Sequence, residues 1–166
     1  MKFFLTLFFS FLTFISTNCF AVSINGIVEA EIVSELEVSE SNSIYMGTIS
    51  TDGTAETVSI DSSGNVTCPP TMHCDGIPQS GKYTISGAPN AEISLDVHES
   101  TLSNSAGTET MDFTPNVGLG EARTLDGTGS HTLEIGGDLS VGANQESDTY
   151  STSNTGGVPM LIDISY

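Results

Sequence analysis

The sequence predicts an all-β fold: one domain of about eight short strands that pack as an antiparallel sandwich or barrel. Three observations support this class. Short runs of alternating aliphatic and polar residues recur along the chain, and Gly, Asn, Asp and Pro separate them. Small polar and β-branched residues dominate, and they favour strands and tight turns over helices. Beyond residue 20 the only phenylalanine is Phe113 and tryptophan is absent, so the core must be mainly aliphatic.

Residues 1–21 are predicted to be a cleaved signal peptide. Lys2 precedes an apolar run, and the small residue Ala21 closes it. The run is too short to be a good membrane anchor, so we expect no membrane insertion after cleavage. Lipidation at Cys19 is the alternative, although the three preceding residues fit a lipobox poorly. We therefore expect residues 22–166 to fold after export, in the periplasm, at the cell surface or outside the cell.

The charge of the chain excludes several kinds of partner. The formal net charge is −18, and beyond the leader only Lys82 and Arg123 are cationic against 21 acidic residues. Nucleic acids require arrays of Lys and Arg, so nucleic-acid binding is not expected. Anionic membranes are disfavoured for the same reason. We expect most carboxylates to lie in water, with a calcium site as the alternative.

The first predicted strand follows the leader. Its aliphatic or small residues occupy alternate positions, which places them on one face of a strand: Val22, Ile24, Gly26, Val28, Ala30 and Ile32. Ile27 interrupts the mostly polar opposite face, and Leu36 and Val38 continue the apolar one. A helix over residues 28–40 is the alternative, because Glu and Leu favour helices.

The other predicted strands follow in order, each with alternating or β-branched residues: 44–49, 56–60, 83–86, 91–97, 109–114, 131–135, 138–141 and 158–166. Asp52-Gly53 predicts a turn, and Gly136-Gly137 separates the two strands that flank it. Residues 66–81 and 147–157 are predicted to be longer loops, and the second could be a mobile surface loop.

Cys68 and Cys74 form the most distinctive local feature. In an exported protein two cysteines this close usually pair, and the closed loop would stabilise the fold by roughly 2–2.5 kcal/mol. A soft-metal site that adds His73 and Met72 is the alternative. We expect the disulfide.

No arrangement of residues indicates catalysis. His98 and His131 lie on predicted strands, and sequence spacing cannot bring either of them to a serine and an acid. Ser140 lacks the glycine pattern of a nucleophile elbow, because Asp138 stands where Gly is needed. We therefore expect no enzyme activity and no cofactor.

Five short motifs cover most of the chain after the leader, and their order is more specific than any one of them: Ile44, Met46, Gly47 and Ile49; Tyr83, Ile85, Ser86 and Gly87; Met111 and Phe113; Leu133, Ile135, Gly136, Gly137, Leu139 and Val141; and Tyr150, Ile162, Ile164 and Tyr166. In this order they resemble domain-of-unknown-function family 4402, a family of small exported bacterial β-proteins. Met46 stands where an aromatic residue is common, and Asp148 and Thr152 replace expected glycines.

That family is similar, at greater distance, to fimbrial subunits and spore-coat-U-type proteins. This resemblance implies an immunoglobulin-like β-sandwich whose subunits assemble by lending strands to one another. Val22, Ile24, Gly26 and Val28 would suit a donor strand; the alternative is that they begin the first strand of their own domain.

The expected function is a non-catalytic, fimbrial-type or surface-assembly subunit. The expected partners are further copies, related subunits or a periplasmic chaperone. The alternative is an acidic sandwich that binds calcium, another metal or a carbohydrate without assembling. A small hydrolase that uses His98 or His131 is a third, less favoured reading.

Overall fold

The structure is a computed structural model that describes residues 23–117 and 123–166. The predicted signal peptide and Val22 lie outside these residues. All regular secondary structure in the described residues is β, and every strand pairing there is antiparallel, which confirms the predicted all-β class. The immunoglobulin-like arrangement remains a prediction. No helix in the described ranges is long and apolar enough to cross a membrane.

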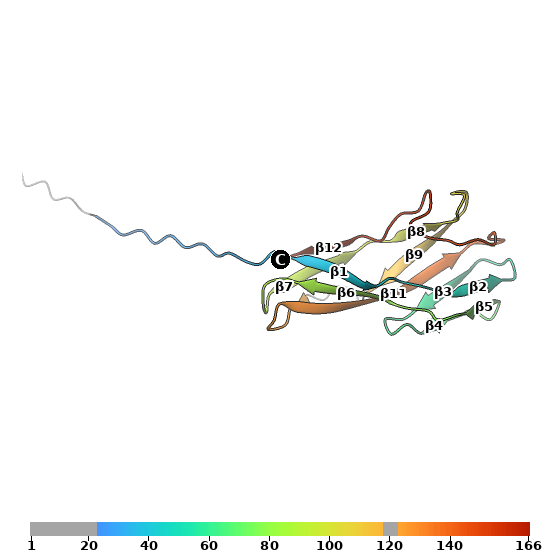
Figure 1. Cartoon of the computed structure of the whole chain (residues 1–166), viewed down its shortest axis with the longest axis horizontal. Helices are drawn as coiled ribbons and strands as arrows, with labels where there is room; N and C mark the ends of the chain where they lie inside the picture. Colours follow the sequence, from blue (N-terminus) through green and yellow to red (C-terminus); the bar gives the residue numbers. More distant parts are fainter. Residues whose placement is uncertain (1–22, 118–122) are drawn as a thin grey trace, which may run out of the picture. The chain divides into compact units, whose positions relative to one another are not determined.

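The described residues form twelve strands, more than the number predicted. Most of them are labelled in Figure 1. They are β1 (Glu37–Asn42), β2 (Thr48–Thr51), β3 (Glu56–Ile60), β4 (Val66–Thr67), β5 (Met72–Asp75), β6 (Gly81–Ser86), β7 (Glu92–Val97), β8 (Ser100–Ser103), β9 (Thr110–Asn116), β10 (Arg123–Thr124), β11 (Ser130–Val141) and β12 (Ile162–Ser165).

The long strand β11 organises the largest sheet. Its first half pairs with β6, and its second half pairs with both β3 and β9. β1 extends this sheet beyond β6, β4 pairs with β3, and β8 pairs with β9. A second sheet has the order β10-β7-β12, and β2 and β5 form a third. The two halves of β11 therefore pair with different strands.

Gly136 and Gly137 lie inside β11, so the prediction that they separate two strands is wrong. A Cβ atom on Gly136 would clash with the carbonyl oxygen of Ile60, and one on Gly137 would clash with Cζ of Phe113. The glycines thus allow β3 and β9 to approach β11 closely. Their role is close packing, not a turn.

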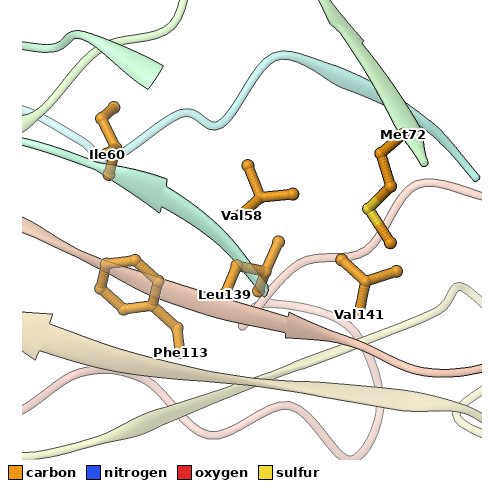
Figure 2. Packing of buried hydrophobic residues seen from close by; sticks show 6 residues of the cluster. All are labelled: Val58, Ile60, Met72, Phe113, Leu139 and Val141. Carbon is orange, nitrogen blue, oxygen red and sulfur yellow. The ribbon is translucent and has the colours of Figure 1, made fainter. Parts of the chain in front are cut away.

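Two apolar clusters form the core. Figure 2 shows the first, which contains Val58, Ile60, Met72, Phe113, Leu139 and Val141. The second contains Ile85, Ile93, Leu125, Leu133 and Ile135, and residues of β12 pack against it. Ile44 and Met160 pack against both clusters. The second cluster joins β6 and β11 to the β10-β7-β12 sheet, so two sheets share this core.

Other strand predictions need correction. Residues 23–36 form no strand, and the first strand begins only at Glu37. The predicted loop 66–81 contains β4 and β5, and β8 was not predicted at all. Contacts group residues 32–166 into one compact unit and assign residues 23–31 to another. An extended segment is a strand only when a partner supplies ladder hydrogen bonds, which explains the missing first strand.

Candidate functional site

The amino-terminal segment, residues 23–33, presents large aliphatic side chains to water. Ile24, Val28 and Ile32 are 92%, 94% and 96% exposed. Ile27 is also largely exposed. Of the predicted donor residues, Ile24, Gly26 and Val28 lie in this segment, whereas Val22 lies outside the described residues. Such a series of exposed aliphatics is typical of a surface that binds a partner.

The two faces of this segment differ in polarity when it is extended. Successive side chains of an extended chain point to opposite sides. Ile24, Gly26, Val28, Ala30 and Ile32 then share one face. Ile27 lies on the other face with Glu29 and Glu31. The segment therefore has the pattern of a strand with one apolar face.

β1 and β12 are among the strands that end their sheets in the described residues, as are β4 and β10. β1 pairs with β6 and is the last strand on that side, and β12 pairs with β7 and is the last strand of its sheet. All six residues of β1 are exposed, whereas Ile162 and Ile164 of β12 are half-buried against the second core cluster. A terminal strand leaves alternate backbone N–H and C=O groups free to pair with another strand.

The beginning of β1 and the end of β12 lie close to each other. The Tyr166 hydroxyl donates to the carbonyl oxygen of Ser34 at 2.5 Å and accepts from the backbone N–H of Ala88 at 2.8 Å. A Cβ atom on Gly87 would lie 2.7 Å from both Leu36 Cδ2 and the Tyr166 hydroxyl. These contacts fix the backbone of Ser34, directly after the amino-terminal segment.

Apolar side chains also mark the outer surface along the last strand. Val158 and Leu161 are 52% and 56% exposed. The backbone of Val158 pairs with Thr101, and the Leu161 carbonyl accepts from the N–H of His98, so this stretch is ordered before β12 begins. The chain between residues 158 and 165 therefore offers apolar side chains and an edge that pairs with no further strand among the described residues.

Cys68 and Cys74 form the predicted disulfide, with Cα atoms 6.0 Å apart. Because both sulfur atoms are bonded to each other, they cannot act as metal ligands in this state. Met72 is buried in the first core cluster, whereas His73 is exposed. No group of three or more His, Cys, Asp or Glu residues within the described ranges could hold a metal ion.

His98 contacts aspartates, and His131 is distant from Ser140, the serine considered as a nucleophile. His98 Nε2 lies 2.9 Å from Asp163 Oδ2 and 3.8 Å from Asp96 Oδ2 on the exposed surface. His131 Nε2 is buried and has no hydrogen-bond partner among the described residues. His131 and Ser140 are both on β11, nine residues apart, a separation of roughly 30 Å along a strand. These two residues therefore do not form a catalytic pair.

Three aspartates accept hydrogen bonds from donors in their own turns, and a fourth, Asp148, accepts them from a distant residue. Hydrogen bonds from Thr54, from Asn65 and from Thr128 lower the pKa of Asp52, Asp61 and Asp126, respectively. The hydroxyl and N–H of Ser105 do the same for Asp148. The first three carboxylates stabilise turns, and Asp148 joins two segments that are 43 positions apart. Part of the negative charge therefore has a structural role.

The predicted loop 147–157 is attached to β8. The side-chain amide of Asn154 donates to the carbonyl oxygen of Ser103 at 2.7 Å, and Ser103 also pairs with Ser151 through the backbone. The Tyr150 hydroxyl donates to Glu109 Oε2 at 2.8 Å. These contacts join residues more than 40 positions apart, so the sequence pattern could not reveal them.

A hollow of about 870 Å³ lies beside the middle of β11. Its lining includes Ile60, Asp61, Asn116, Arg123 and Glu134, and none of the described residues that line it is aromatic. Ligand pockets are usually lined by apolar and aromatic groups with a few polar ones. The hollow is therefore a weaker candidate than the exposed segment and the free strand edges.

The chain matches the family described as Domain of unknown function (DUF4402) over residues 36–158, which confirms the predicted family. No curated protein and no solved structure matches the chain. The matched range ends before β12 and begins after the amino-terminal segment. The amino-terminal segment and β12 thus lie outside the matched range, whereas β1 lies inside it.

Proposed function

We propose a structural role outside the cytoplasm for this chain, which belongs to the DUF4402 family. In this role it is a non-catalytic, fimbrial-type subunit that assembles with further copies or related subunits. The amino-terminal segment acts as a donor strand that pairs with a sheet edge of the next subunit. A periplasmic chaperone would occupy the same surfaces before assembly.

The exposure of Ile24, Val28 and Ile32 carries this proposal. Burying three such side chains would contribute roughly 5–9 kcal/mol. Association costs about 4–15 kcal/mol in lost freedom, so side chains alone do not ensure a stable contact. Strand addition supplies ladder hydrogen bonds as well, each worth about 0.5–1.5 kcal/mol. Burial of the apolar face and pairing of the backbone are therefore both needed for a stable contact between subunits.

The disulfide supports the proposed location outside the cytoplasm. Structural disulfides persist in oxidising compartments and are rare in the cytosol. The Cys68–Cys74 bond agrees with the export that the leader sequence predicts. The proposal leaves open whether the subunit stays in the periplasm, reaches the cell surface or is released.

Light scattering coupled to size-exclusion chromatography of the exported chain tests the proposal. We expect a series of oligomers that disappears in the double variant Ile24→Asn, Val28→Asn. Glu29→Gln, Glu31→Gln is the matched control, because it changes the other face of the same segment, and its oligomers should persist.

A monomeric wild-type chain would contradict the assembly role. If the melting temperature of that monomer also rose with calcium, the acidic binding module would be supported instead.

A further inference from the structure

We propose that the acceptor for the amino-terminal segment is the free edge of the last strand of a second copy. The incoming segment runs antiparallel to residues 160–165 and places Ile27 beside Leu161. This inference rests on the proposed function and adds the identity of the edge, the direction and the register.

Charge distinguishes the outer edge of β1 from that of β12. β1 carries Glu37 and Glu40, and charged residues on an edge strand discourage further pairing. The segment itself carries Glu29 and Glu31, so addition to β1 would bring like charges together. β12 carries one acidic side chain, Asp163, whose Oδ2 lies 2.9 Å from His98 Nε2, and its Ile162 and Ile164 are only half-buried. The edge of β12 is therefore the better acceptor.

The apolar and outer faces of the amino-terminal segment match those of β12. Ile162 and Ile164 of β12 point toward the second core cluster, and Leu161 is exposed on the other side. In the segment, Val28 and Ile24 share one face and Ile27 occupies the other. When the apolar face of the segment extends the core, Ile27 comes to the outer surface, where Leu161 is exposed. This position accounts for Ile27, the aliphatic residue that interrupts the polar face of the segment.

The acidic side chains determine the direction. With Ile27 beside Leu161, a parallel strand would place Glu29 beside Asp163. An antiparallel strand places Asn25 beside Asp163. Like charges directly opposite each other destabilise a pair of strands. Antiparallel pairing also places Gly26 beside Ile162 and Val28 beside Met160, so the bulky Ile162 meets a residue with no side chain.

The fixed position of Ser34 limits the distance between subunits. Its carbonyl oxygen is held by Tyr166, so only residues 29–33 connect the donor contacts to the rest of that subunit. A fully extended connection from Val28 to Ser34 spans roughly 20 Å. The donor subunit therefore lies close to the acceptor edge.

Disulfide trapping tests the edge and the register. The double variant Ile27→Cys, Leu161→Cys should form intermolecular disulfides, seen as a ladder on a non-reducing gel that reductant collapses. Ile27→Cys, Ser39→Cys tests the edge of β1, and Glu29→Cys, Leu161→Cys shifts the register by two residues. We expect about tenfold less ladder from both controls, because directly opposite Cβ atoms are about 5 Å apart and diagonal ones about 7–8 Å.

The outcomes separate this inference from the proposed function. A stronger ladder from the Ser39 pair or the Glu29 pair, or a disulfide within a single chain from the Leu161 pair, would overturn the proposed acceptor. Oligomers in the wild type without a ladder from the Leu161 pair would overturn it too, while leaving assembly intact. A wild type that forms no oligomers would contradict the proposed function itself. Circular dichroism of each variant confirms that it has folded.

Discussion

The amino-terminal segment and the last strand have the same kind of sequence and a different structure. Both alternate aliphatic and polar residues: Ile24, Gly26 and Val28 in one, Ile162 and Ile164 in the other. The aliphatics of the first are exposed, whereas those of β12 pack against the core and pair with β7. Alternation thus specifies which face is apolar, but a strand also needs a neighbour to pair with.

The largest expected effect comes from placing the same charge in both regions. Ile164→Asp should lower the free energy of unfolding by about 3 kcal/mol, because it places a carboxylate against an apolar cluster. Val28→Asp adds the same charge to a side chain that is already in water. It should leave the unfolding of the monomer almost unchanged and abolish oligomers.

Urea unfolding of both variants, under conditions in which the chain is monomeric, checks this contrast. Equal destabilisation by the two substitutions would show that Val28 is packed in the monomer. The proposed difference between the amino-terminal segment and β12 would then be wrong.

An intermediate effect is expected at the point where the two regions meet. Tyr166→Phe removes the hydroxyl that bonds to Ser34 and to Ala88 while keeping the ring. The loss of these bonds should lower the free energy of unfolding by about 1 kcal/mol. Oligomers should persist, because the donor face is unchanged. Thermal melting and size-exclusion chromatography measure the two effects, and loss of oligomers with an unchanged melt would assign Tyr166 to assembly instead.

The smallest expected effect concerns the turns, where a side-chain carboxylate, and not a neighbouring strand, accepts hydrogen bonds from backbone N–H groups. The Thr128 hydroxyl, followed by the N–H groups of Ser130 and Thr128, holds the pKa of Asp126 below its ordinary value of 3.8. A lowered pKa in the folded state stabilises the fold fully above pH 3.8 and loses that stabilisation as the pH falls through the folded value. Asp126→Asn keeps an acceptor oxygen but cannot titrate.

Unfolding by urea between pH 6 and about pH 3 measures this contribution. The wild type should lose slightly more stability on acidification than Asp126→Asn does. Identical pH profiles would show that Asp126 contributes nothing through its charge.

The sequence predicted the fold class, the disulfide and several strands. The predicted strand 56–60 matches β3, and the alternation of 91–97 gave β7 within one residue. β8 was missed because its buried residues include Ser100 and Ser103, which carry no hydrophobic signal. It is a strand because β9 pairs with it, and such pairing is not visible in a short polar run.

The candidate site was predictable only in part. Alternation identified Ile24, Gly26 and Val28 as a donor face, but it equally suited a first strand of the domain. The acceptor edge depends on which strands end their sheets, and the attachment of loop 147–157 depends on Ser103 and Glu109. Both features follow from contacts between distant parts of the chain, which spacing does not encode.

The shared strand β11 has a consequence for how the domain comes apart. Leu133 and Ile135 lie in one core cluster, and Leu139 and Val141 lie in the other, on one uninterrupted backbone. Melting of either half removes hydrogen bonds from a strand on which the other half depends. We therefore expect the two clusters to unfold together, because they share one strand.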